Sequence, residues 1–246
     1  MTYATSISSI GGGGDVRDAV RAACALSDVV EIAVGARALE NDPWHALMEI
    51  KADTHVEFVG HHTLPLVAGS AVRPGLNNQR EIAALLNRYE ITQYSAHPLQ
   101  LSEVTEGELF EWFYRSADIF GEHGISFSLE TMYTPRDSRD RTSGRWHLMD
   151  EDTVRRFVES AMGRGYNRPL LLDLAHIHIE VQHHRWRWES VHELVKSSAV
   201  SCEHVIENDG RRDRHDQLSD AHQVRRELNK IEAAFDGLII DEGRVR

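Results

Sequence analysis

The stretch HVIENDGRRDRH, residues 204–215, joins the end of an apolar run to a turn and then to an Asp-Arg-His triplet. Asn208-Asp209-Gly210 is a turn signal. Asp213 and His215, one residue apart on an irregular loop, can both face one metal ion, and His204 can reach a neighbouring ion. Histidines in loops are usually just solvated, so this segment alone only suggests a metal site. The suggestion gains weight because almost every other predicted strand also ends in His, Asp or Glu.

The chain repeats one pattern, in which a short apolar run is followed by a loop and a helical pattern. The runs predicted as strands are residues 7–10, 29–34, 55–60, 91–96, 125–129, 169–172, 200–206 and 238–240. Helices are predicted over residues 15–26, from 43 onward, and over 78–87, 106–123, 150–164, 189–197 and 217–235, with Thr105 and Glu108 as a capping box.

Strand-then-helix units without room for hairpins argue for parallel strands and right-handed crossovers. Eight units in 246 residues predict an α/β fold, a closed (β/α)₈ barrel that forms one domain over residues 1–246. An open doubly wound sheet is the alternative. The barrel is favoured because polar residues recur at the carboxyl ends of strands three to eight, whereas an open sheet needs them only at its switch point.

The bulk composition is that of a soluble globular protein, with 41% hydrophobic and 27% charged residues. We expect a cytoplasmic protein without a membrane span or secretory signal, whose Cys24 and Cys202 are reduced thiols. The net charge of −12 argues against nucleic acid as a partner. Gly11 to Gly14 lack the Lys-Ser/Thr of a phosphate-binding loop and are interpreted as a strand-to-helix turn.

In a barrel, the carboxyl ends of all strands point at one axis. The loops at these strand ends surround a bowl-shaped hollow. The residues expected to line this bowl are His61 or His62, His97, Glu130, Asp173, His176, His204, Asp213, His215 and Glu242. So many ligands exceed what one ion can use, and two or three ions of zinc, iron or manganese are predicted, with Glu130 bridging. Without cations, the carboxylates would repel one another.

Several motifs resemble the AP endonuclease family 2 group of xylose isomerase-like barrels. They are Ser8-Ser9-Ile10-Gly11-Gly12-Gly13, His97-Pro98, Leu129-Glu130-Thr131, Leu172-Asp173-Leu174-Ala175-His176 and Asp213-Arg214-His215. The resemblance implies three ion sites, formed by His61/His62 with His97 and Glu130, by Glu130 with Asp173, His204 and Glu242, and by His176 with Asp213 and His215. Plain sugar isomerases and epimerases of this fold usually keep only the second set.

The chain departs from this family at residues 61–65, which read His-His-Thr-Leu-Pro instead of His-Ala-Pro-Tyr. By strand alternation, Val56 and Phe58 face the helices and His61 turns inward. His62 could serve instead if the strand bends at Gly60. The short chain and its acidic charge also count against DNA repair, though not against a metal site.

Nine arginines follow predicted strands five to seven, on the face expected to carry the site. They are Arg136, Arg139, Arg141, Arg145, Arg185, Arg187, Arg211, Arg212 and Arg214. Either they are solvated beside local aspartates, or they bind phosphate or carboxylate groups of a substrate. The residues assigned to substrate binding are Arg136, Arg185, Trp186, Arg211 and Arg212, with Trp186 or Trp188 available for stacking. Residues 131–148 are interpreted as a lid.

The favoured activity is phosphate-ester hydrolysis of a compact anionic substrate, with Glu130, Glu242 and Arg214 as catalytic residues. Glu130 would bridge two ions and Arg214 would neutralise phosphoryl charge. One alternative is iron- and O₂-dependent oxidation of a peptide or small metabolite. Another is a sugar-type isomerase or epimerase, in which Glu130 and Glu242 are paired acid/base groups at a single ion. A metal-storage role ranks last, and a homodimer is left open.

Overall fold

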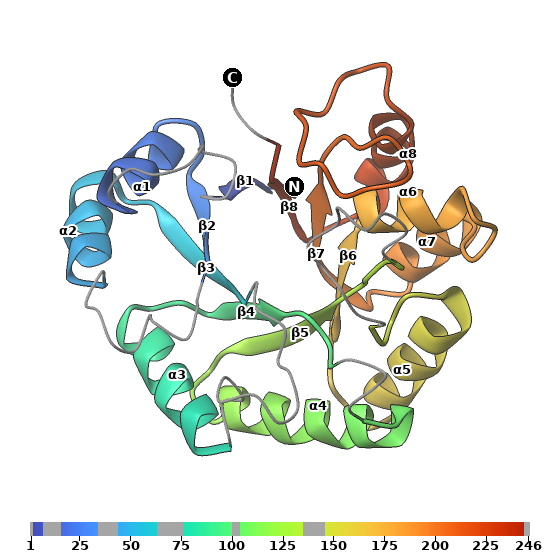
Figure 1. Cartoon of the computed structure of the whole chain (residues 1–246). Coiled ribbons are helices and arrows are strands. Elements are labelled where there is room, and N and C mark those ends of the chain that lie inside the picture. The colour runs from blue at the N-terminus through green and yellow to red at the C-terminus, as the bar shows by residue number, and fades with distance from the viewer. Residues whose placement is uncertain are drawn as a thin grey trace.

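Eight parallel strands close into a barrel, with neighbours in chain order and β8 paired to β1 (Figure 1). The computed structural model describes residues 2–6, 16–33, 44–62, 76–99, 104–134 and 146–243. The strands are β1 (Thr2–Ser6), β2 (Val29–Ala33), β3 (Glu57–His62), β4 (Gln93–Ala96), β5 (Ser126–Glu130), β6 (Leu170–Asp173), β7 (Val200–Val205) and β8 (Leu238–Asp241). The predicted (β/α)₈ barrel is confirmed, and the open sheet is excluded because β1 and β8 pair over four residues.

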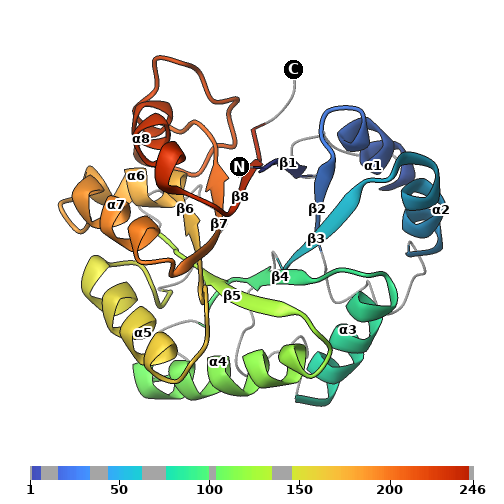
Figure 2. The ribbon, with the colours of Figure 1, turned by 180° about the vertical axis from the view of Figure 1, so that it is seen from behind.

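The helices lie outside the ring of strands, as both views show (Figures 1 and 2). They are α1 (Val16–Cys24), α2 (Trp44–Thr54), α3 (Leu76–Arg88), α4 (Glu106–Gly121), α5 (Glu151–Gly163), α6 (Leu174–Val181), α7 (Trp188–Lys196) and α8 (Gln223–Ile231), with a 3₁₀ turn at Glu232–Ala234. The predicted capping box at α4 is present, since Thr105 and Glu108 exchange hydrogen bonds. In the described part of the chain, no helix is long and apolar enough to cross a bilayer.

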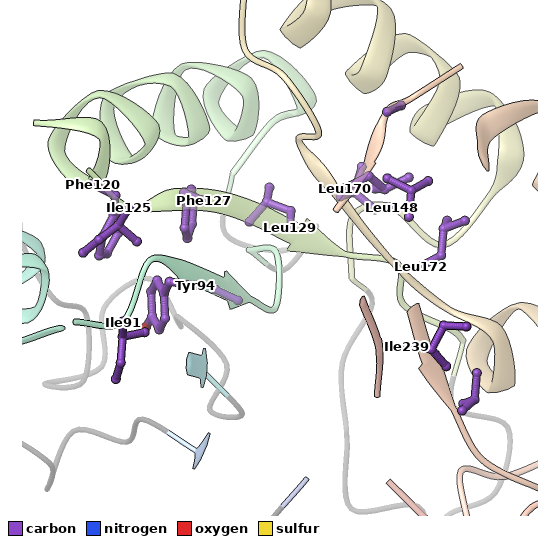
Figure 3. Packing of buried hydrophobic residues seen from close by; sticks show 14 of the residues in the cluster. Ile91, Tyr94, Phe120, Ile125, Phe127, Leu129, Leu148, Leu170, Leu172 and Ile239 are labelled. Carbon is purple, nitrogen blue, oxygen red and sulfur yellow. The ribbon is translucent and has the colours of Figure 1, made fainter. Parts of the chain in front are cut away.

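Side-chain alternation divides each strand between two apolar layers. Outward residues pack on the helices, as Phe127 of β5 does against Phe120 of α4, with ring centroids 5.0 Å apart (Figure 3). Each such buried ring contributes roughly 1.5–3 kcal/mol. Inward residues form a second cluster that fills the barrel, which we call the barrel plug: Ala4, Val29, Val59, Leu171, Cys202, Leu238 and Ile240.

Three elements differ from the expectations. The first strand is Thr2–Ser6, whereas the predicted strand 7–10 and the glycine loop 11–14 lie outside the described residues. Helix α6 begins directly at the end of β6 and was not expected. Helix α8 starts at Gln223 rather than near 217, because the chain before it pairs back on itself through an antiparallel bridge between Glu207 and Asp216.

Candidate metal centre

A ring of ionisable side chains lies immediately above the barrel plug. Because strand side chains alternate, the residue two positions beyond an inward residue also faces inward. Glu31, His61, Asp173 and His204 follow Val29, Val59, Leu171 and Cys202 in this way. We call the strand-borne and strand-end members of these groups the ligand ring, and they are Glu31, His61, His97, Glu130, Asp173, His204 and Glu242; His176 of α6 joins them from outside the strands.

Two imidazoles of the ligand ring converge on one carboxylate. His61 Nε2 lies 3.3 Å and His97 Nε2 lies 3.0 Å from the same atom, Oε2 of Glu130. The other ring nitrogen of His61, Nδ1, lies 2.9 Å from Ser95 Oγ. The structure thus places His61 toward the bowl, as alternation predicted. His62 belongs to β3, but its side chain lies outside the described residues.

A second part of the ligand ring is shared through Asp173. This residue forms one compact group with Glu130 and His176 and another with His204 and Glu242, in which candidate ligand atoms lie within 4.8 Å of one another. His204 Nδ1 lies 3.4 Å from Glu242 Oε2. Asp173 also caps α6, because its Oδ1 accepts a hydrogen bond from the His176 backbone at 2.8 Å. That cap turns the His176 side chain into the bowl, with its Nδ1 3.2 Å from Glu130 Oε1.

The third predicted set is arranged differently from the other two. Asp213 Oδ2 lies 2.9 Å from His215 Nε2 and 3.6 Å from His176 Nε2. Among the described residues, these three do not appear together in a group with ligand atoms mutually within 4.8 Å. Asp213 therefore acts as a partner between two imidazoles, and a third ion has no compact set of ligands here.

Glu31 was missed by the sequence reasoning, although the structure places it in the ligand ring. It is 2% exposed, and its Oε2 lies 2.8 Å from His204 Nε2. A signal was present: a lone carboxylate in the apolar strand VVEIA must be buried and paired, because an unpaired buried charge is costly.

Three buried nitrogen or oxygen atoms of the site make no hydrogen bond within the described part of the chain. They are His97 Nδ1, His204 Nδ1 and Asp213 Oδ1. Buried polar groups are normally satisfied, so such orphans point to a missing ion or water. The donors are imidazole nitrogens and carboxylate oxygens, which suit zinc, iron or manganese. The residues present therefore fit a divalent metal ion.

Burial and neighbouring charge shift the pKa values of this cluster in opposite directions. Burial lowers the pKa of His61 to about 3 and raises that of Glu242 to about 8. For His204, burial is outweighed by Glu242 and Glu31, which hold its pKa well above the usual range. For Glu130, burial is likewise outweighed by His97, and its pKa lies well below the usual range. At neutral pH, His204 thus holds a second proton, Glu242 holds its own proton and His61 is neutral, and a bound cation would displace protons from this cluster.

The described residues assigned to substrate binding make their contacts outside the ligand ring. Trp186 is 2% exposed and its indole donates to the Met149 carbonyl, which leaves almost none of its ring for a ligand. Arg185 donates to Thr134 at 2.7 Å. Arg212 and Arg214 lie near the local carboxylates of Asp209 and Asp216. Arg211 is exposed.

The other arginines after β5 and most of the predicted lid cannot be placed, because they lie outside the described residues. These arginines are Arg136, Arg139, Arg141 and Arg145. In the loop after β7, Arg212 and Arg214 lie beside local aspartates. These contacts agree better with solvated arginines than with arginines that are free to bind an anionic substrate.

Comparisons with known proteins give structural neighbours only. No protein-family model and no curated protein sequence matches the chain. A crystal structure of D-psicose 3-epimerase from Clostridium cellulolyticum H10 with D-tagatose has a TM-score of 0.72 at 15% identity, covering 100% of this chain and 86% of that one. 3-Keto-D-glucoside 4-epimerase YcjR from E. coli has a TM-score of 0.68 at 14% identity, covering 100% and 93%. The IolI protein with a bound zinc atom has a TM-score of 0.69 at 14% identity, covering 99% and 90%.

These comparisons correct the favoured activity. The neighbours include epimerases of several sugars. Hydrolysis was favoured because three ion sites were predicted, and among the described residues the set for the third site, His176, Asp213 and His215, does not form a compact group. The expectation of phosphate-ester hydrolysis, with Arg214 as a phosphoryl partner, is therefore wrong, and oxidative chemistry is likewise disfavoured. At these low identities the neighbours establish architecture alone, and the chain shares with them the closed (β/α)₈ barrel that its strand-then-helix pattern predicted.

Proposed function

We propose that the protein is a metal-dependent isomerase or epimerase of a sugar-type hydroxycarbonyl compound. The observation that carries this proposal is the position of two buried carboxylates, Glu130 and Glu242, in groups that share Asp173. They come from β5 and from the end of β8, which are separated around the barrel by β6 and β7. Two carboxylates on different sides of one bowl can exchange protons with both faces of a substrate carbon.

The first ion would be held by Glu130, Asp173, His204 and Glu242. When bound, such an ion polarises an oxygen of the substrate and makes the neighbouring C–H more acidic. Either Glu130 or Glu242 takes the proton from the carbon beside the carbonyl, and the other carboxyl returns a proton to the opposite face. The buried setting keeps bulk water away from the carbanion-like intermediate state.

A second ion is included in the proposal, held by His61, His97 and Glu130. Both Nε2 atoms lie near Glu130 Oε2, and the three residues offer ligand atoms within 4.8 Å of one another. His176, Asp213 and His215 would then orient the substrate and the ligand ring by hydrogen bonds. Elemental analysis of protein purified without added metal or chelator should accordingly give about two ions per chain.

The proposed reaction is tested by solvent exchange. Protein loaded with Mn²⁺ or Zn²⁺ is incubated in D₂O with a panel of free ketoses and keto-glycosides, and NMR follows deuterium at the carbon beside the carbonyl. We expect deuterium uptake together with a new epimer or isomer. Glu130→Gln and Glu242→Gln should each slow exchange by about 10²–10⁴-fold.

His215→Ala is the comparison variant, because it removes an orienting imidazole and neither a proposed ion ligand nor a proposed acid/base group. His215 is partly exposed, and its Nδ1 lies 4.0 Å from Glu242, so its loss should leave the first ion in place and reduce exchange much less. If metal-loaded protein incorporates deuterium into no compound of the panel, the proposed reaction is overturned.

A further inference from the structure

Glu31 is the one member of the ligand ring that the proposed reaction does not use. Its carboxylate is buried in the middle of β2, with Oε2 2.8 Å from His204 Nε2. Replacing a buried ion pair by apolar residues is often neutral or stabilising. A valine or isoleucine would suit this strand as well, so the fold alone does not account for a carboxylate here.

His204 offers its two ring nitrogens to different partners. Nε2 meets Glu31, while Nδ1 points the other way, toward Glu242 at 3.4 Å. His204 is 1% exposed, and its Nδ1 has no hydrogen-bond partner in the described ranges. An imidazole ligand must present a free lone pair on the nitrogen that faces the ion. With the proton on Nε2 and donated to Glu31, the lone pair of Nδ1 is directed into the group with Asp173 and Glu242.

We propose that Glu31 is a positioning residue, which fixes the ring orientation and tautomer of His204 so that Nδ1 binds the ion of the ligand ring. Such carboxylate–histidine–metal arrangements raise the basicity of the ligand, and losing the carboxylate typically costs 10–100-fold in metal affinity. Glu31 acts through His204 and does not touch the substrate. The inference rests on the metal site of the proposed function and not on the sugar reaction.

The chain offers a matched control for Glu31. Glu203 is also a buried glutamate on a barrel strand, adjacent to His204 in sequence, but alternation turns it toward the helices. Glu31→Gln and Glu203→Gln therefore remove one buried carboxyl each at similar depth. Glu31→Leu completes the series, because the amide of Gln can still accept the Nε2–H hydrogen bond whereas Leu cannot.

The test is the dissociation constant for Zn²⁺, measured by competition with a chromophoric chelator on protein whose melting curve shows that it is folded. Glu31→Leu should weaken the tightest site by about 10–100-fold, Glu31→Gln should lie between Leu and wild type, and Glu203→Gln should stay within about threefold of wild type. Equal affinities of wild type and both Glu31 variants would overturn the proposal.

A second measurement separates positioning from general damage and from direct ligation. In zinc-loaded protein labelled with ¹⁵N-histidine, the His204 Nε2–H signal should be protected from exchange in wild type and lose protection in Glu31→Leu. Elemental analysis should still find the wild-type number of ions at saturating zinc. Loss of one whole ion from Glu31→Gln would overturn the positioning role and make Glu31 a ligand itself.

These measurements use no substrate, so a failed solvent-exchange assay with normal zinc binding would remove only the sugar reaction. A wild-type protein that binds no divalent ion would remove both proposals.

Discussion

The partners of a buried carboxylate in this barrel depend on whether its side chain faces the inside of the barrel or the helices. Those facing inward meet imidazoles, as Glu31 and Glu130 do. Glu203 faces outward, and neither of its carboxyl oxygens has a hydrogen-bond partner in the described residues. Burial, with a smaller effect of Glu232, raises the pKa of Glu203 to about 8. Glu203 therefore holds its proton in the folded protein through neutral pH.

This proton makes stability depend on pH in a definite direction. The pKa of Glu203 is about 8 when folded and near its ordinary 4.5 when unfolded, so the folded state binds more protons between these values and stability falls as pH rises. Glu203→Gln has no proton to lose. The free energy of unfolding of the variant, minus that of wild type, should increase by roughly 1–4 kcal/mol from pH 5 to pH 8.

Urea denaturation at several pH values checks the Glu203 prediction, because the titration of the ligand ring is common to both proteins and cancels in the difference. A difference that stays constant from pH 5 to pH 8 would show that Glu203 ionises in the folded state.

At the scale of elements, the loop between β7 and α8 is fastened to α6 by the side chain of Asn208. Its Nδ2 donates to the Ala175 carbonyl at 2.8 Å, and its Oδ1 accepts from the Gly210 backbone at 2.9 Å. His178 of α6 lies 3.0 Å from the same oxygen. This fastening sets the position from which the loop presents Asp213 to His176.

Gly210 tests how closely the β7–α8 loop must approach α6. It has a φ of +69°, and a Cβ added there would lie 2.9 Å from Cγ of Gln182. Gly124 has a similar φ of +73° with nothing within 4 Å of an added Cβ. Both alanine variants pay for the left-handed backbone, about 1–2 kcal/mol.

We expect Gly210→Ala to lose about 1–3 kcal/mol more than Gly124→Ala, because it also overpacks the contact with α6. Chemical denaturation of the two variants measures the difference. Equal losses would mean that the contact relaxes freely and does not position the loop.

The same elements show what the sequence can and cannot predict. The inward polar positions at the ends of β3 to β6 and of β8 were predictable, because an apolar run that ends in His, Asp or Glu specifies both the strand and its inward end. Glu31 lies inside its run, where the sequence indicates a buried, paired carboxylate but does not identify its partner on a distant strand. Helix α6 was missed because its cap is Asp173 itself, so no turn residue separates strand from helix.

Other features depended on contacts that spacing does not reveal. The residues TYATS lack a strong apolar run, and β1 is a strand because β8 pairs with it. Asp213 and His215 are close in sequence, yet their spacing does not show that they bind each other at 2.9 Å instead of sharing an ion with His176.

At the scale of the whole molecule, the ligand ring, His176 of α6 and the β7–α8 loop bring together five carboxylates and five imidazoles at the carboxyl ends of the strands. A divalent ion should therefore bind the folded protein much more strongly than the unfolded chain. At a free concentration of about 100 times its dissociation constant, it should add about 2.7 kcal/mol to the free energy of unfolding.

For a chain of this length, that gain corresponds to a rise in Tm of roughly 5–10 °C. Thermal denaturation with Zn²⁺ or Mn²⁺, then with excess chelator, measures this shift and its reversal. His204→Ala should show a much smaller shift. A wild-type Tm that does not respond to either ion would contradict a metal centre in the ligand ring.

The barrel plug closes the bowl from below, and its residues Val29, Val59 and Leu238 line a separate hollow of about 480 Å³ at the opposite end of the barrel. Among the described residues, the base of the bowl is closed by this plug, so the ligand ring faces the side of the strand ends. If the proposed function holds, an ion would have to enter before the reactant that covers it. A bound reactant should then slow the loss of metal to a chelator.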